Sequence, residues 1–137
     1  LGLLPIRTTF IPAKTTRQVE VAASWPEHCT LKGFELHHGR TALVEKSNRQ
    51  TVYPLSSSEP IGWVSQPHSG SVIGTYLHGV LDNGCWRRLW LNQLRRRRGL
   101  DELAILEMHH TEHRERLMNR LADAFEQHVN LTPLLEP

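Results

Sequence analysis

A histidine that ends an apolar segment is the residue whose type and position most directly suggest chemistry. Residues 72–77 are β-branched and apolar, which predicts a buried strand, and His78 and Gly79 follow it. Asp82 and Asn83 then predict a helix N-cap before the amphipathic run 86–94. Open α/β sheets place their ligand crevice at such strand ends. His78 is therefore a candidate general base or acid; the alternative is a strand-end histidine bonded to a nearby carbonyl group.

A carboxylate and a second histidine lie two positions apart on another predicted strand. Alternation over residues 30–37 puts apolar side chains on one face, with Glu35 and His37 together on the other. Both are expected to face the crevice that holds His78, where they would orient a reacting group or bind a substrate. The alternative is a strand whose polar side faces solvent, as is common in antiparallel sheets.

Two cysteines are candidate nucleophiles on weaker grounds. Cys85 is expected in the first turn of a helix, where the positive end of the helix dipole can activate a thiol. A nucleophile elbow, however, needs small residues on both sides of its strained turn, and Trp86 follows Cys85 directly. Cys29 lies in a predicted loop. Structural roles are therefore favoured for both thiols.

Two further clusters suggest binding but have plainer explanations. His109, His110 and His113 would sit near the start of a predicted helix, yet their order is not that of a zinc-protease motif and no further ligand is implied. The arginine run 95–98 ends a predicted helix, where positive charge complements the helix dipole. We therefore predict neither a metal site nor nucleic-acid binding.

The pattern of the whole chain predicts an α/β fold in which strands are followed by C-terminal helices. Besides 30–37 and 72–77, strands are expected at 17–23 and 61–65, and segments 41–44 and 51–53 are expected to form a hairpin around the turn 45–50.

Helices are expected at 83–97, with Gly99 as the C′ residue, and at 112–129. On the second helix one face is predicted to be core, formed by Leu117, Leu121 and Phe125. Thr132 and Pro133 suggest the start of a last short helix.

Composition points to one globular piece in a reducing compartment. The chain has 137 residues and a formal net charge of +2, which gives no reason to expect nucleic acids or anionic membranes as partners. No apolar run approaches the roughly 18 residues that a membrane-spanning helix needs. The 2 cysteines are too few for a disulfide scaffold. We predict a cytoplasmic protein.

An ordered set of motifs resembles the glutamine amidotransferase domain of the cobyric acid synthase family, enzymes of cobalamin biosynthesis that amidate corrinoid carboxylates. The motifs occupy residues 1–5, 7–10, 14–19, 33–41 and 74–79. The likeness runs from residue 1 to about residue 129, and the set in order is far more specific than any one motif. The related cobyrinic acid a,c-diamide synthases share the layout, but segments 14–19 and 33–41 look more like the cobyric acid enzymes.

The resemblance assigns roles to the candidates named above. It implies that His78 is the general base, then acid, of a cysteine-dependent glutaminase. The wider class carries an orienting glutamate two positions after this histidine, but Val80 stands there, so a Cys–His dyad is expected and what orients His78 stays open. Glu35 and His37 match a glutamate and a histidine of the family, which supports a substrate-binding or orienting role.

The resemblance also implies that residues 1–137 are the C-terminal portion of a class I glutamine amidotransferase-like domain. In the family the nucleophilic cysteine precedes the segment that matches residues 1–5, so the chain alone is expected to be inactive. Glutamine, the N-terminal part of the same protein and, through its synthetase domain, a corrinoid are the implied partners. No phosphate loop is present here, so ATP and magnesium are expected in that synthetase domain. Uncovered sheet edges would favour self-association. The alternative is a non-catalytic interaction module that pairs with a partner subunit.

Overall fold

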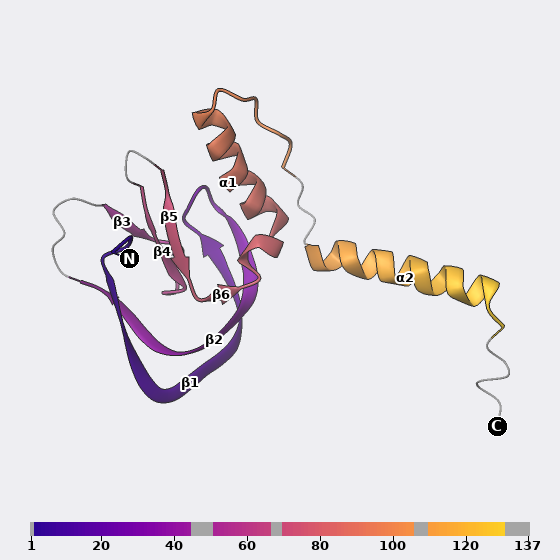
Figure 1. The fold of residues 1–137 in the computed structure, drawn as a ribbon, viewed down its shortest axis with the longest axis horizontal. Coiled ribbons are helices and arrows are strands. Elements are labelled where there is room, and N and C mark those ends of the chain that lie inside the picture. The colour runs from indigo at the N-terminus through magenta and orange to yellow at the C-terminus, as the bar shows by residue number, and fades with distance from the viewer. Residues whose placement is uncertain (1, 45–50, 67–69, 106–109, 131–137) are drawn as a thin grey trace.

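The computed structural model describes residues 2–44, 51–66, 70–105 and 110–130, with the side chains of 110 and 111 left aside. Two small antiparallel sheets come first in the chain, and helices follow (Figure 1). The strands are β1 (Ile6–Ala23), β2 (Cys29–Leu43), β3 (Val52–Pro54), β4 (Gly62–Ser65), β5 (Val72–Thr75) and β6 (Leu77–His78). A 3-10 turn, η1 (Val80–Asp82), leads to α1 (Gly84–Arg97), and α2 (His110–His128) follows. The predicted α/β class, with strands followed by helices, is confirmed.

A long β1–β2 hairpin forms most of the first sheet, and β6 completes it in the order β1-β2-β6. Its pairing runs from Ile6 opposite Leu43 to Ala23 opposite Cys29, with an irregularity between Phe10 and Thr15. The strands extend well beyond the predicted segments 17–23 and 30–37. Only the end near the turn carries alternating buried apolar residues, and cross-strand hydrogen bonding continues the ladder through the polar remainder.

The predicted hairpin between 41–44 and 51–53 is wrong. Residues 41–43 belong to β2 and pair with β1, whereas β3 pairs with β4 in the second sheet, whose order is β3-β4-β5. The turn predicted at 45–50 lies outside the described residues. Short-range signals favour the nearest partner, but the longer ladder to β1 offers residues 41–43 more pairing.

The predicted strand 72–77 is split between the two sheets. β5 pairs with β4, and after Tyr76 the chain crosses to the first sheet, where β6 pairs with β2. The backbone N–H of Tyr76 donates to the carbonyl oxygen of Ile61 at 3.0 Å, and that of Leu77 donates to Oγ1 of Thr75 at 3.0 Å. Residues of β5 are only partly buried, so the segment joins two sheets instead of running through the middle of one.

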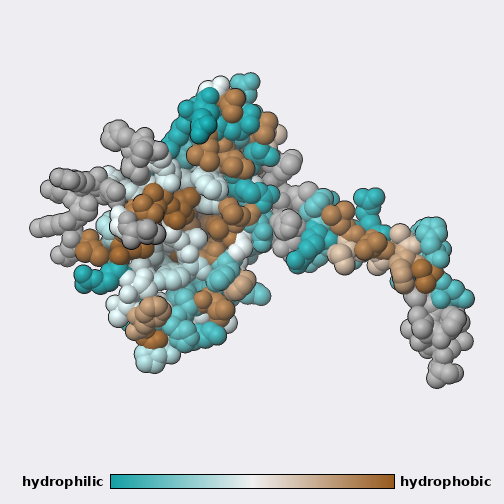
Figure 2. Space-filling model, in the orientation of Figure 1, coloured by the Kyte–Doolittle hydropathy of each residue, from teal (hydrophilic) through white to brown (hydrophobic). Residues whose placement is uncertain are grey.

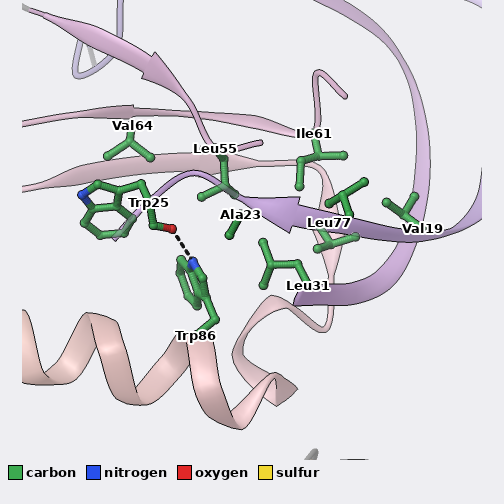
Figure 3. Close-up of a cluster of buried hydrophobic side chains, with 10 residues drawn as sticks. Val19, Ala23, Trp25, Leu31, Leu55, Ile61, Val64, Leu77 and Trp86 are labelled. Atoms are coloured by element: carbon green, nitrogen blue, oxygen red, sulfur yellow. Dashed lines mark hydrogen bonds between the residues drawn. The ribbon is translucent and has the colours of Figure 1, made fainter. Parts of the chain in front are cut away.

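Buried apolar side chains from both sheets meet α1 in one core (Figure 3). Trp86 of α1 is 1% exposed, and its indole Nε1–H donates to the carbonyl oxygen of Trp25 at 2.7 Å. The two indole rings meet edge to face, with centroids 6.1 Å apart. The tryptophan that argues against a nucleophile elbow at Cys85 is therefore the anchor that fixes α1 to the sheets.

Asn83 occupies the predicted N-cap position of α1, but its side chain binds the neighbouring strand. Its Oδ1 accepts from the backbone N–H of Lys32 at 2.8 Å, and its Nδ2 donates to the carbonyl oxygen of Lys32 at 2.9 Å. No side-chain bond caps the helix itself. The residue is 3% exposed, so these hydrogen bonds clamp the start of α1 onto β2.

Replacing Asn83 with alanine is expected to lower the free energy of unfolding by about 2 kcal/mol, because two backbone groups of Lys32 lose their partner at a nearly buried site. Asn83→Asp keeps the acceptor for the Lys32 N–H, but it turns a buried carboxylate oxygen toward the three carbonyl oxygens that Nδ2 donates to, so its loss should be larger. Urea denaturation followed by circular dichroism measures both values. An alanine variant as stable as the parent chain would show that the clamp is not stabilising.

The second helix extends away from the sheets (Figure 1), and its predicted core face is uncovered in the described part of the chain. Leu117, Leu121 and Phe125 are each about half exposed, and apolar patches follow α2 over the surface (Figure 2). The helix is confirmed, but no described element packs on its apolar face. Among the described residues no helix is both long enough and apolar enough to cross a bilayer. Thr132 and Pro133 lie outside the described residues.

Candidate active site

His78 ends β6 at the free edge of the first sheet, and its side chain is exposed. Its imidazole ring stacks on the ring of Phe34, its cross-strand partner on β2, with centroids 4.7 Å apart and planes 8° from parallel. The stacking covers one face of the imidazole, and His78 as a whole is exposed. His78 is not among the residues that line the two clefts described below, one beside Glu35 and one beside Cys29.

Two glycines allow the backbone to carry His78 at this place. A Cβ on Gly33 would overlap the carbonyl oxygen of His78 and lie 2.8 Å from Cδ1 of Leu77, so β6 can approach β2 only because residue 33 has no side chain. Gly79 has φ of 80°, a left-handed conformation that favours glycine, and begins the turn into α1. Sequence reasoning assigned Gly33 no role, although a glycine inside a strand is a signal of close backbone approach.

Glu35 and His37 lie together on one face of β2, but the predicted face is wrong. Residues opposite each other in an antiparallel pair point to the same side of a sheet, and His78 is opposite Phe34. Glu35, the next residue, therefore points to the other side together with His37. The register between β2 and β6 decides this, and no local pattern in either strand reveals it.

Glu35 is 3% exposed and is held by two neighbours. Nε of Arg17 donates to Oε2 of Glu35 at 2.6 Å, and Nε2 of His37 lies 3.4 Å from Oε1 of Glu35. Arg17 also pairs with Glu59, and the hydrogen bonds to Glu59 and then Glu35 raise the pKa of the guanidinium group. The buried carboxylate is thus neutralised by a cation that two acids hold in place.

His37 connects this ion pair to Tyr76, the residue at which the chain changes sheets. Its ring stacks on that of Tyr76 with centroids 4.0 Å apart, and its Nδ1 lies 2.9 Å from the carbonyl oxygen of Gly39. The Tyr76 hydroxyl group hydrogen bonds to Thr41. Both ring nitrogens of His37 face oxygen acceptors, and a neutral imidazole can donate to only one of them.

A cleft of about 940 Å³ runs along this face of the β1–β2 hairpin. Its polar and charged lining includes Arg7, Arg17, Glu35, His37, Arg40 and Tyr76. Arg40 and Thr41 follow Gly39 on β2 and also line this cleft. Because Arg17 is already paired, Arg7 and Arg40 are the cations through which the cleft would attract a negatively charged ligand.

The two cysteines lie at a separate cleft, next to the start of α1. Cys29 and Cys85 are both free thiols of intermediate exposure. Burial raises the pKa of the Cys29 thiol to about 12, with smaller contributions from the charge of Cys85 and from a hydrogen bond to it. Cys29 therefore keeps its proton at neutral pH, which disfavours it as the activated nucleophile that attacks a carboxamide.

The other predicted clusters have local partners. Arg96 donates to Oε1 of Glu102 at 2.6 Å, and Nε of Arg95 donates to the carbonyl oxygen of Asp101 at 2.6 Å, so two members of the arginine run bind the loop after α1. His109 and the side chain of His110 lie outside the described residues. In the part of the chain that the structure describes, no group of three or more possible ligands is placed to hold a metal ion.

The sequence of the chain is similar to a known family of proteins. Residues 1–86 match the model of the CobB/CobQ-like glutamine amidotransferase domain. A cobyric acid synthase of Parasynechococcus marenigrum (strain WH8102) is 53% identical over 138 residues, which cover 100% of this chain and 27% of the relative. A cobyric acid synthase of Prochlorococcus marinus (strain MIT 9313) is 48% identical, over 98% of this chain and 27% of its own length.

The chain thus spans about 27% of the length of these curated relatives. No solved structure matches it. The family match covers β1, β2 and the β5–β6 crossover, and so includes His78, Glu35 and His37. The chain belongs to the CobB/CobQ-like glutamine amidotransferase family.

Proposed function

We propose that this chain is the histidine-bearing portion of the glutaminase half of a cobyric acid synthase, which supplies ammonia for ATP-dependent amidation of corrinoid carboxylates. One observation carries the proposal: in a chain of this family, an exposed histidine ends an edge strand and is held by a stacked ring and a close backbone approach. An accessible, oriented imidazole is what proton transfer to a bound amide requires.

In this proposal His78 acts on glutamine together with a cysteine located in another part of the longer protein. The thiolate attacks the carboxamide carbon after the imidazole takes the thiol proton, and the imidazolium then protonates the departing ammonia. Val80, at the position of the orienting glutamate in the wider class, packs against the buried core. Instead of a glutamate, stacking on Phe34 would restrict the orientation of the His78 ring.

Glu35 and His37 serve, in this proposal, as orienting residues. Because they lie on the face of β2 opposite His78, direct contact with the same reacting atoms is disfavoured. The Arg17–Glu35 pair and the His37–Tyr76 stack instead fix β2 and the crossover that leads to His78. Substrate binding in the cleft on their face has less support, because the reacting histidine lies on the other side of the sheet.

The remaining activity belongs to the longer protein. ATP and magnesium would be bound by its synthetase domain, which would also hold the corrinoid, and a cytoplasmic location would suit two free thiols. The half-exposed apolar residues of α2 favour a second candidate, an amidotransferase-like module that only pairs with a partner. The residues that precede position 1 in the longer protein distinguish the two. A Gly-x-Cys-Gly-Gly-like elbow supports the glutaminase, and its absence supports the module.

The 137-residue chain by itself is expected to release no glutamate from glutamine. Without a thiolate partner for His78 the attack on the carboxamide lacks its nucleophile, and the residual rate falls by several orders of magnitude. Purified chain is incubated with glutamine and glutamate release is measured, with Cys85→Ser in parallel. Turnover that disappears in the serine variant would make Cys85 the nucleophile.

Gel filtration of the same sample tests the expected self-association through exposed edges and apolar surface.

A further inference from the structure

Cys29 and Cys85, far apart in the sequence, line the same cleft. Cys29 is the first residue of β2, and Cys85 lies in the first turn of α1. The cleft measures about 450 Å³, and its walls also include His28, Lys32, Asn83 and Glu112. None of the roles proposed above for His78 or Glu35 uses this site.

The fold itself imposes the approach of the two thiols. Asn83, two residues before Cys85, is bonded through both ends of its amide to the backbone of Lys32, three residues after Cys29. The indole of Trp86, the residue after Cys85, donates to the carbonyl oxygen of Trp25 at 2.7 Å. Contacts on both sides of the thiol pair therefore hold the two elements together.

We propose that Cys29 and Cys85 form a dithiol site that a low-molecular-weight disulfide, such as oxidised glutathione, converts into an intramolecular disulfide. Both thiols line one cleft, and the charge of Cys85 contributes to the raised pKa of Cys29, so the two side chains are close neighbours. A disulfide here would covalently join the start of β2 to the first turn of α1.

The reaction balances in two exchange steps. Cys85, as the thiolate, attacks one sulfur of oxidised glutathione, which forms a mixed disulfide and releases one glutathione. Cys29 then gives up its proton and attacks Sγ of Cys85, and the second glutathione leaves with that proton. Two protein thiols are oxidised and one glutathione disulfide is reduced to two thiols. Cys85 acts first because the raised pKa of Cys29 keeps that thiol protonated.

The bond would restrain the segment that follows His78. Residues 79–83 link His78 to α1, and α1 would become covalently tied to the strand that carries Phe34 and Glu35. Because the cross-link closes a long loop of the unfolded chain, the oxidised form should also unfold at a higher temperature, by several degrees.

The test is equilibration of the 137-residue chain in glutathione buffers of graded redox ratio, with acid quenching and peptide mass spectrometry. The expected product is a Cys29–Cys85 linkage within one chain, with the loss of two hydrogens. In the folded chain it should form at a glutathione disulfide content about tenfold lower, or less, than in the same chain unfolded in urea. Cys29→Ser should instead hold one glutathione on Cys85.

A stability measurement on Cys29→Ser serves as the control. Reduced Cys29→Ser and reduced parent chain are compared by circular dichroism, so that loss of the linkage through misfolding is recognised. Linkage that forms no more readily in the folded chain than in urea overturns the proposal. So does disulfide bonding only between chains, or a lower unfolding temperature in the oxidised form.

Discussion

Replacing His78 with alanine in the longer protein is expected to reduce glutamine-dependent amidation by roughly a hundredfold to ten-thousandfold, the usual contribution of a positioned proton-transfer group. Amidation supported by free ammonia should change little, because ammonia bypasses the glutaminase step. Both rates are measured on one preparation, with glutamine or an ammonium salt as the nitrogen source. The ratio of the two rates isolates the role of the histidine from any loss of folded protein.

A second exposed histidine on the same strand system offers a matched control. His38 lies on β2, is exposed, and is two positions beyond Leu36 on the face that carries Phe34. His38→Ala should retain both activities. Equal loss of glutamine- and ammonia-dependent amidation in His78→Ala would mean that His78 serves the structure and not the glutaminase.

Gly33→Ala is expected to be the most disruptive single-methyl change in the described part of the chain near His78. The added Cβ would overlap the carbonyl oxygen of His78 and crowd the Leu77 side chain, so β6 must move off β2. Overpacking of this kind costs about 1–3 kcal/mol of stability. The displaced strand would also carry His78 away from its stacked position on Phe34, so glutamine-dependent amidation should fall more than the ammonia-dependent rate.

Gly70→Ala is the control for this change. Among the residues that the structure describes, nothing lies within 4 Å of a Cβ built at Gly70, and its backbone is not in the left-handed region, so stability should be unchanged or slightly higher. Urea denaturation of the two variants of this chain measures stability, and amidation by the corresponding longer proteins measures the effect on activity. If Gly33→Ala matched Gly70→Ala in both measurements, the β2–β6 approach would not depend on glycine.

Local signals were sufficient for the first helix. The sequence predicts 83–97, and α1 runs from Gly84 to Arg97. Gly99 has φ of 67°, as expected of a C′ glycine, and its N–H donates to the carbonyl oxygen of Arg96 at 3.0 Å. Start and stop residues act within one or two turns, so the sequence alone contains the information.

Strand partners were not accessible in the same way. The segment before His78 has the composition of one strand, yet Tyr76 marks a change of sheet, and residues 41–43 pair with β1 instead of the nearby β3. The pairings that decide this connect residues far apart in the sequence. An alternating pattern says which residues share a face, but it does not say which strand lies beside them.

The sequence by itself determined the α/β class, the limits of α1, the placement of Glu35 and His37 on one face of their strand, and the family to which the chain belongs. These depend on residue type, short-range periodicity and an ordered set of motifs. Three features were decided by the tertiary structure alone. Glu35 and His37 lie on the other face of the sheet from His78, the missing side chain of Gly33 lets β6 approach β2, and Cys29 lines the same cleft as Cys85. Each of these follows from strand register or from the docking of α1, and both are fixed only when distant segments pack together.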